Sequence, residues 1–196
     1  MNTFQRALIG AALLASVTGC GINNIPTYDE SVTAAWSNVE NQFQRRADLI
    51  PNLVETVKGY AAHEEEVLVE VIEARNKATQ MQIPADLLSN PEAFSAFQAN
   101  QGEITQALSK LFALSEAYPD LKANQNFLEL QAQLEGTENR IAVARRDYIT
   151  AVQQYNTELR TIPGRWWHSL MYSDMQKRET FSAESGAEEN PQVKFN

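Results

Sequence analysis

The amino-acid sequence predicts an all-α fold, a long up-and-down antiparallel helical bundle, on three observations. Apolar residues recur at steps of three and four along most of the chain, which is the period of an amphipathic helix. No stretch alternates apolar and polar residues as a half-buried strand does, and hairpin dipeptides such as Asn-Gly are absent. The 196 residues are 43% apolar and 21% charged, so the chain has enough apolar side chains for a buried core.

A first helix is predicted from near Asp29, a suitable capping residue, to about Met81. The apolar part of its seam comprises Val32, Trp36, Val39, Phe43, Ile50, Leu53, Val57, Val67, Val71 and Ala74. Pro51 interrupts this helix. Because proline removes one backbone hydrogen bond and crowds the preceding turn, we expect a kink or a break at residues 49–51. A break there would divide the segment into two helices.

Two further long helices follow the first. Asn90 is expected to cap the second helix, with Pro91 at its first position, and this helix runs to about Tyr118. Residues 119–120, Pro-Asp, form a tight corner that makes the neighbouring helices antiparallel. The third helix is predicted over residues 121–159. The sustained spacing of the seams predicts left-handed packing at an angle of about +20°.

The bundle is expected to occupy residues 28–163, with a Pro-Gly dipeptide ending its last helix. Residues 164–181 form an amphipathic C-terminal segment that contains Trp166 and Trp167. We expect this segment to be either a short fourth helix or an interfacial segment. Residues 182–196 are acidic and small, and this composition predicts a flexible tail.

Residues 1–19 have the three-part layout of an export signal: a basic start, an uncharged apolar middle and small residues before a cysteine. The apolar stretch is too short to cross a bilayer as a helix, which takes roughly 20 residues. The four residues that end at Cys20, Val-Thr-Gly-Cys, resemble the lipobox of bacterial lipoproteins, and this resemblance implies that Cys20 is acylated. The alternative is a cleaved, secreted protein in which the cysteine has no role.

Acylation of Cys20 would anchor the chain on the non-cytoplasmic side of a bacterial membrane. Residues 20–27 contain Gly, Asn and Pro without periodicity, so we expect the lipidated cysteine to be followed by a short tether. Gly21 is not the acidic residue that usually retains lipoproteins in the inner membrane. The periplasmic face of the outer membrane is therefore favoured if the source has two membranes.

Composition and spacing exclude several kinds of site. The formal net charge of −9 argues against nucleic-acid binding, which uses basic stripes to displace counterions. The single cysteine excludes an internal disulfide and a cysteine-based zinc site. Three glutamates follow His63, but Val67 stands where a zinc protease needs its second histidine, and Tyr60 where a di-iron site needs a glutamate. We interpret these acids as a helix-surface cluster, and expect no catalytic residue, metal or cofactor.

Four charged residues fall on the predicted core seams, where an unpaired charge would be costly: Arg46, Glu64, Glu138 and Arg145. One interpretation is that they form ion pairs across the bundle, with an acid on one helix facing an arginine on another, and so fix the register. Another is that Arg46 or Arg145 binds an anionic ligand or partner. A third is that the side chains reach water from the edges of the seams.

Three polar residues, Asp48, Asn52 and Lys58, lie near Pro51 at the predicted kink. A break exposes backbone polar groups, and Asp48 or Asn52 can satisfy them. In the alternative interpretation these residues line a docking notch, in which Gly59 permits the close approach of another backbone. The candidate binding residues are therefore Arg46, Asp48, Asn52, Lys58, Glu138 and Arg145.

Three dense motifs identify a family resemblance: WSNVENQ at residues 36–42, RRADLIPNLV at 45–54 and VKGYAAHE at 57–64. With shorter matches up to residue 163, they resemble the LemA family of bacterial envelope proteins. The resemblance implies a long helical bundle held at a membrane by its N-terminus, and no settled activity; related proteins occur in several membrane contexts, including magnetosome membranes. The chain departs from the family where the Cys20 signal replaces the usual membrane helix, and around Trp166 and Trp167.

The function expected from these observations is that of a membrane-anchored, non-catalytic envelope scaffold or adaptor, which contacts an unidentified envelope protein through the first helix. The anchor, the rigid bundle and the lack of catalytic motifs support this expectation. The alternative is a ligand- or peptide-sensing bundle with a pocket near Arg46 and Tyr148. An enzyme is the least supported class, because the motif search finds no catalytic constellation. The sequence does not predict the oligomeric state.

Overall fold

The computed structural model of the protein describes residues 21–182. Every regular element in this range is helical, so the prediction of an all-α fold is confirmed. The elements are α2 (Asn24–Lys58), α3 (Glu65–Gln80), the 3-10 turn η1 (Leu87–Ser89), α4 (Pro91–Ser115), α5 (Pro119–Lys122), α6 (Gln125–Glu158) and α7 (Gly164–Met171). The predicted export signal, the acylation site at Cys20 and the predicted tail after Ser182 lie outside the described residues.

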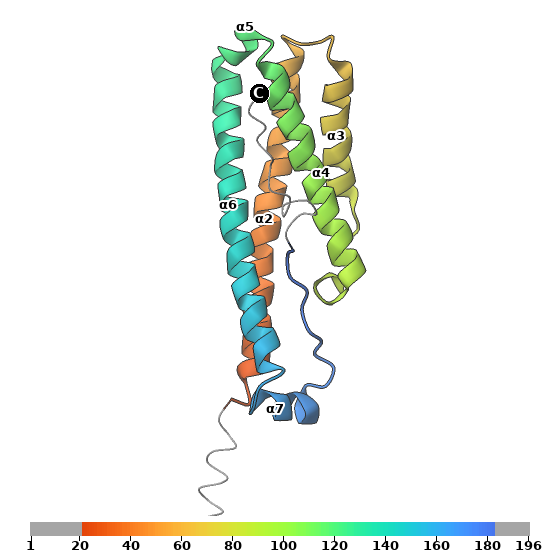
Figure 1. The fold of residues 1–196 in the computed structure, drawn as a ribbon, viewed down its shortest axis with the longest axis vertical. Coiled ribbons are helices and arrows are strands. Elements are labelled where there is room, and N and C mark those ends of the chain that lie inside the picture. Colours follow the sequence, from red (N-terminus) through yellow and green to blue (C-terminus); the bar gives the residue numbers. More distant parts are fainter. Residues whose placement is uncertain (1–20, 183–196) are drawn as a thin grey trace, which may run out of the picture.

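Two long antiparallel helices, α2 and α6, form the spine of the bundle (Figure 1). They have 35 and 34 residues, which corresponds to roughly 50 Å of helix each. The shorter α3 and α4 pack beside one half of this pair, and α5 forms the corner between α4 and α6. The chain thus runs up, down, up and down, and the predicted topology is confirmed. No helix within residues 21–182 combines the length and the apolar character needed to cross a membrane.

The other half of the α2–α6 pair is covered by the C-terminal part of the chain. Helix α7 lies at the end of the bundle where α2 begins and α6 ends, which we call the α7 end; the opposite end is the α5 end (Figure 1). From α7 the chain returns along the bundle as an extended segment, residues 172–182, which we call the strap. Its last part reaches η1 and α4, where the Glu179 N–H donates to the Leu88 carbonyl over 2.6 Å.

The buried side chains form two clusters along the bundle. The cluster towards the α7 end is rich in aromatic rings and includes Trp36, Phe43, Phe94, Phe97, Tyr148, Tyr155 and Phe181. The cluster towards the α5 end is mostly aliphatic and includes Ile50, Leu53, Val57, Leu68, Val71, Ile104, Leu111 and Leu134. Most ring pairs in the first cluster meet at tilted or edge-on angles, as when Trp36 lies 5.2 Å from Phe97 and 5.3 Å from Tyr148 between ring centroids.

The first helix begins at Asn24 and not near Asp29, so the expected tether over residues 20–27 is too long. Ile25 is fully buried and extends the apolar seam of α2 by two turns beyond Val32. Pro26 is compatible with this earlier start, because the first N–H groups of a helix have no partner within the helix. Tertiary burial of Ile25 therefore continues a helix that the local composition did not predict.

The break expected at Pro51 is also wrong. Helix α2 runs through Pro51 to Lys58, and the chain breaks instead at residues 59–64 before α3 begins. Proline cannot bond the carbonyl four residues earlier, that of Ala47, but Arg75 Nε on α3 donates to this oxygen over 3.0 Å. The uninterrupted helix places Ile50 and Leu53 on either side of the proline in the fully buried core. The predicted first helix is therefore divided into α2 and α3 by a turn that follows Lys58, and not by a break at Pro51.

The remaining predicted helix boundaries lie within four residues of the observed ones: the second helix ends at Ser115 and not near Tyr118, and the third begins at Gln125 and not at residue 121. The Asn90 side chain accepts a hydrogen bond from the Ala93 N–H, so the predicted cap of α4 is confirmed. The corner at residues 119–120 is the short helix α5, and α6 follows it. Asn124 caps α6 by accepting from the Phe127 N–H over 3.0 Å, a cap that the seam pattern did not reveal.

Candidate functional site

A buried arginine joins three helices between the two core clusters. Arg46 on α2 is 1% exposed. Its Nη1 donates to Glu138 Oε1 on α6 at 2.8 Å and to Thr105 Oγ1 on α4 at 2.9 Å. Its Nη2 donates to the carbonyl and side-chain oxygens of Gln101 on α4 at 3.1 and 2.8 Å. One guanidinium thus fixes the relative positions of α2, α4 and α6.

The charge of this arginine is balanced by a partner at the edge of the core. The Glu138 side chain is 40% exposed, so water solvates one side of the ion pair while the other side is buried. The predicted cross-bundle ion pair is confirmed for Arg46 and Glu138. Such a pair adds little net stability but penalises any register that separates its members. The Phe43 ring, 5.2 Å from the guanidinium carbon, completes the arginine's surroundings.

Arg145 belongs to the same small recess as this ion pair. The recess has a volume of about 40 Å³, and Arg46, Glu138, Arg145 and Phe181 contribute to its walls. The guanidinium carbon of Arg145 lies 4.4 Å from the centre of the Phe181 ring, a cation–π contact between α6 and the strap. This volume is enough for one or two water molecules but not for an organic ligand. Arg46, Glu138 and Arg145, three of the six candidate binding residues, therefore lie together, and the contacts described here join them to other parts of the protein.

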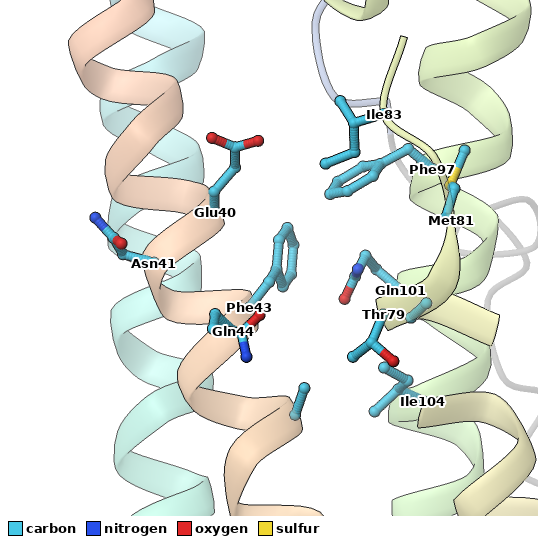
Figure 2. A pocket seen from close by; sticks show the side chains of 12 residues that line it. Glu40, Asn41, Phe43, Gln44, Thr79, Met81, Ile83, Phe97, Gln101 and Ile104 are labelled. Carbon is cyan, nitrogen blue, oxygen red and sulfur yellow. The ribbon is translucent and has the colours of Figure 1, made fainter. Parts of the chain in front are cut away.

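A larger cavity opens on the other side of Gln101. It has a volume of about 250 Å³ and lies between α2 on one side and α3, α4 and the segment after α3 on the other (Figure 2). Glu40 and Gln44 of α2 supply polar groups at its edge, and Phe43 and Phe97 supply aromatic walls. Gln101 lines both this cavity and the recess beside Arg46. The volume suits a small molecule or one side chain of a peptide.

The other three candidate residues stand apart from this site. Asp48 is exposed and accepts a hydrogen bond from Gln44 Nε2, one turn earlier on α2, at 2.7 Å. Asn52 is exposed too, and Lys58 is the last residue of α2. Helix α2 does not break at Pro51, so the expected notch does not form. The carbonyl that the proline leaves without a donor, that of Ala47, is satisfied by Arg75 and not by Asp48 or Asn52.

Glu64 has a partner that the seam pattern did not predict. It was expected to face an arginine, but its carboxylate accepts a hydrogen bond from the Tyr118 hydroxyl at 2.7 Å. This hydrogen bond favours the neutral phenol and raises the pKa of Tyr118. The contact ties the turn before α3 to the end of α4. The apolar spacing identifies which face of a helix is buried. Which residue of a neighbouring helix lies opposite that face depends on where each helix begins.

The strap packs against the bundle in a way that the sequence analysis did not predict. The Tyr148 hydroxyl donates to the Glu179 carbonyl at 2.8 Å, and the Tyr155 hydroxyl donates to the Gln176 carbonyl at 3.0 Å. Arg178 Nη2 lies 2.8 Å from Asp29 Oδ1, which joins the strap to α2. Phe181, an isolated aromatic residue in a polar stretch, was the one signal in the sequence that this segment is buried.

The site offers no arrangement for metal chemistry in the described part of the chain. No group of three or more His, Cys, Asp or Glu side chains in residues 21–182 is placed to hold a metal ion. His63 lies in the turn between α2 and α3, and not on a helix surface as expected. Burial raises the pKa of Tyr148 and also raises that of Tyr155, to about 12, so both phenols keep the proton that they donate to the strap up to a higher pH than an exposed tyrosine does.

Comparison with known proteins identifies relatives. A sequence model described as the LemA family matches residues 35–195, a range that includes α7 and the strap. Magnetosome proteins MamQ 1 and MamQ 2 of Paramagnetospirillum magneticum are each 27% identical over 185 residues, which cover 86% of this chain and 67% of the relative. Magnetosome protein MamQ of Magnetospirillum gryphiswaldense is 25% identical over 175 residues, covering 81% and 64%.

Proposed function

Because the chain belongs to the LemA family, we propose that it is a non-catalytic scaffold or adaptor of the bacterial envelope, anchored by a lipid on Cys20. The observation that carries this proposal is the short stretch of sequence between the anchor and the bundle. Helix α2 begins at Asn24, and the Asn24 side chain donates to Glu158 Oε1 at the end of α6. A lipid on Cys20 would therefore hold both long helices directly, without a flexible linker.

The shape of the bundle supports a role in holding a partner at a set distance from the membrane. A helix pair roughly 50 Å long keeps its surface in a fixed position relative to the anchor. The outer face of α2 presents a stripe of exposed polar side chains: Ser37, Asn41, Gln44, Asp48, Asn52 and Glu55. We assign partner contact to this polar stripe, because non-obligate protein interfaces are about as polar as the rest of a protein surface.

The names of the relatives are in keeping with this proposal. Three curated relatives are named as magnetosome proteins, and none of these names states an enzymatic activity. A structural role within a bacterial assembly accommodates both these proteins and the present chain. The Arg46 cluster then serves to keep α2, α4 and α6 in register, so that the polar stripe has a fixed geometry.

The anchor is tested by replacing the cysteine. We expect Cys20→Ser to move the full-length protein from the membrane fraction to the soluble fraction of the cell envelope. Mass spectrometry of the membrane-bound wild type should find acyl chains on Cys20. A membrane-bound wild type that carries no acyl chain on Cys20 would refute lipid anchoring.

The partner surface is tested by photocrosslinking in intact cells. A photoreactive amino acid at Asn41, Asp48 or Asn52 is expected to capture one reproducible envelope protein, identified by mass spectrometry. The same amino acid at Val143 or Ile149, both exposed on α6, provides a matched control and should not capture that protein. Equal capture from both helices, or capture of lipid alone from the α2 positions, would contradict the assignment of the polar stripe.

A second candidate function, ligand sensing, is favoured by the 250 Å³ cavity that adjoins the Arg46 cluster. A ligand there would contact Gln101 and so act on the hydrogen bonds that join α2 to α4. Binding to the folded state alone would raise the melting temperature. A metabolite screen by thermal shift tests this function, with Thr79→Phe as the control, because Thr79 is exposed at the cavity and a larger side chain would narrow it. A shift that persists in Thr79→Phe would place the ligand elsewhere.

A further inference from the structure

The exposed apolar side chains of the described chain are concentrated at α7. The four most exposed large apolar side chains within residues 21–182 are Leu170 (76%), Ile162 (65%), Trp166 (56%) and Met171 (56%). Trp166 and Leu170 are four residues apart on α7, which places them along one side of this helix, and Ile162 lies in the turn just before it. We call these four residues the α7 apolar face. Side chains of this size are seldom exposed together without a partner.

The opposite side of α7 is held against the bundle, so the apolar face has a fixed direction. Trp167, Tyr172 and Met175 pack against the core cluster at the α7 end. His168 Nε2 lies 2.9 Å from the Met175 carbonyl oxygen and links α7 to the first residues of the strap. Gly164 lies so close to the Glu158 backbone that a Cβ at this position would overlap the Glu158 carbonyl oxygen. These contacts keep Trp166 and Leu170 turned away from the core.

The α7 apolar face lies beside the point where the chain leaves for its anchor. A Cβ built on Gly21 would lie 3.4 Å from Pro163 Cγ, so the residue that follows Cys20 lies beside the residue that precedes α7. Figure 1 shows the start of α2 and α7 at the same end of the bundle. Adjacent Cα atoms are about 3.8 Å apart, so acyl chains on Cys20 would enter the membrane next to α7.

The charges near α7 differ from those of the whole chain. Residues 159–177 contain three basic side chains, Arg160, Arg165 and Lys177, and one acidic side chain, Asp174, whereas the whole chain has a net charge of −9. All four are exposed. Basic side chains beside an apolar face that contains tryptophan are typical of segments that lie in a membrane interface, where arginine reaches anionic headgroups and tryptophan sits at headgroup level.

We propose that the α7 apolar face inserts into the headgroup–acyl boundary of the membrane that holds the lipid on Cys20. This inference rests on the proposed anchoring. A membrane is favoured over a second copy of the chain because the one-residue link to Cys20 brings α7 to the lipid surface. The lipid and α7 then form two attachments, and the bundle stands on the membrane by its α7 end with its α5 end away from it. Two such attachments bind a membrane more firmly than one.

The test uses the full-length, acylated protein in vesicles of phosphatidylethanolamine and phosphatidylglycerol at a ratio of about 3:1. An environment-sensitive fluorophore is attached to Leu170→Cys, and in a separate sample to Leu128→Cys, which is the control. Leu128 is 44% exposed and lies near the start of α6 at the α5 end. Because acylation occupies the sulfur of Cys20, the introduced thiol is the reactive one. Both sites are exposed, and circular dichroism verifies that each variant is folded.

The expected result is a blue-shifted emission for the probe at position 170, with at least about twofold quenching by brominated lipids, as for a group buried about 5–10 Å below the headgroups. The probe at position 128 should keep its aqueous emission. Aqueous emission at both sites on acylated protein would overturn the docking of α7 and leave the lipid anchor in place. Quenching at both sites would mean that the bundle lies flat on the membrane, and would overturn the proposed orientation.

Two further outcomes also decide the inference. A blue shift at position 170 without quenching by brominated lipid would show that a protein, such as a second copy of the chain, covers the α7 apolar face. That result would overturn a lipid partner. If mass spectrometry finds no acyl chain on Cys20 of the purified protein, the proposed anchoring fails, and the orientation inferred from it fails as well. The acylation measurement therefore separates the two proposals.

Discussion

At the scale of single residues, the Arg46 side chain joins α2, α4 and α6 through hydrogen bonds. Its guanidinium is buried, yet its one charged partner, Glu138, is partly exposed to water. The two members of this pair should therefore respond differently to substitution. Loss of the carboxylate leaves a buried cation, whereas loss of the arginine leaves a carboxylate that water can solvate.

The first prediction is a strong coupling between Arg46 and Glu138. Glu138→Leu should lower the free energy of unfolding by about 2 kcal/mol, because a buried charge loses its counterion while its neutral acceptors remain. The double variant Arg46→Leu with Glu138→Leu should be more stable than Glu138→Leu alone. Urea denaturation of all four proteins measures the coupling, and additive effects would show that the ion pair does not act as a unit.

The second prediction concerns Gly136, in the interior of α6. A Cβ at this position would meet no atom within 4 Å, so alanine fits without strain. Gly136→Ala should raise the free energy of unfolding by about 0.5–1 kcal/mol, because alanine loses less backbone entropy in a helix. Gly164→Ala is the contrasting variant and should lower the melting temperature, since its Cβ would overlap the Glu158 carbonyl. Similar effects of the two variants would contradict this account.

An ion pair across the bundle was one of three interpretations of the charged seam residues, and Arg46 with Glu138 forms such a pair, whereas the contacts of Glu64 and Arg145 were not predicted. A charge on a core seam has to be compensated, and this requirement favours a facing acid for Arg46 without identifying which one. Glu64 meets a tyrosine, and Arg145 lies over the ring of Phe181. These partners depend on the turn before α3 and on the path of the strap, and neither is encoded in the spacing of one helix.

At the scale of helices, Pro51 shows why a local rule failed. The proline does remove a hydrogen bond from α2, as the sequence predicted. The freed carbonyl of Ala47 is satisfied by Arg75 from α3, and the buried residues around Pro51 favour an uninterrupted helix. The sequence of α2 cannot reveal this compensation, because the donor lies on the next helix and reaches Ala47 only after the chain has turned back.

The third prediction follows from this compensation. Arg75→Ala should lower the free energy of unfolding by about 1–2 kcal/mol, because it leaves the Ala47 carbonyl without its donor. In a Pro51→Ala background the restored N–H can bond the same carbonyl, so Arg75→Ala should cost less there. Chemical denaturation of the four variants tests this difference. An equal cost in both backgrounds would mean that Arg75 stabilises the bundle by other contacts.

The strap is the element whose stability should depend most on pH. Two buried tyrosines, Tyr148 and Tyr155, donate hydrogen bonds to strap carbonyls. Burial raises the pKa of both, that of Tyr155 to about 12, with the charge of Asp29 as a secondary cause. In the unfolded chain a tyrosine titrates near pH 10. Between these values the folded state binds more protons than the unfolded state.

The fourth prediction is therefore that stability falls as pH rises above about 10, and that the contribution of these tyrosines is complete below this pH. Ionised tyrosine also loses its donor, so the strap should detach. Thermal melts from pH 8 to pH 12 measure the slope, which should be shallower for Tyr155→Phe. Tyr60→Phe, at an exposed position of the α5 end, should keep the wild-type slope. An unchanged slope in Tyr155→Phe would assign the alkaline loss to other groups.

The whole molecule consists of one helix pair with two different coverings. Helices α3 and α4 cover the aliphatic cluster, and the strap, with η1 and the start of α4, covers much of the aromatic cluster. The period of the apolar residues predicted the helices, and the tight corner at residues 119–120 predicted their antiparallel order. It could not predict the strap, because an extended segment of polar residues with one phenylalanine has no repeating pattern.

The fifth prediction is that removal of the strap loosens one half of the molecule. A chain that ends after Met171 lacks Phe181 and the ion pair of Arg178 with Asp29. Hydrogen exchange should become faster in residues 25–43 and 141–158, while residues 50–57 and 127–134 remain protected, because local stability follows local packing. Uniformly faster exchange would show that the two clusters unfold as a single unit.

The antiparallel pairing of α2 and α6 determines how the protein would respond to mechanical load. Tension between Gly21 and the start of α6 would pull the two helices past each other in shear, because these points lie at opposite ends of the pair (Figure 1). All contacts along the α2–α6 interface then resist the load at the same time. Tension between Gly21 and the end of α6 would instead peel the helices apart one layer at a time. The rate of forced unfolding should therefore depend on the direction of pull, and should be slower for the shearing geometry than for the peeling geometry.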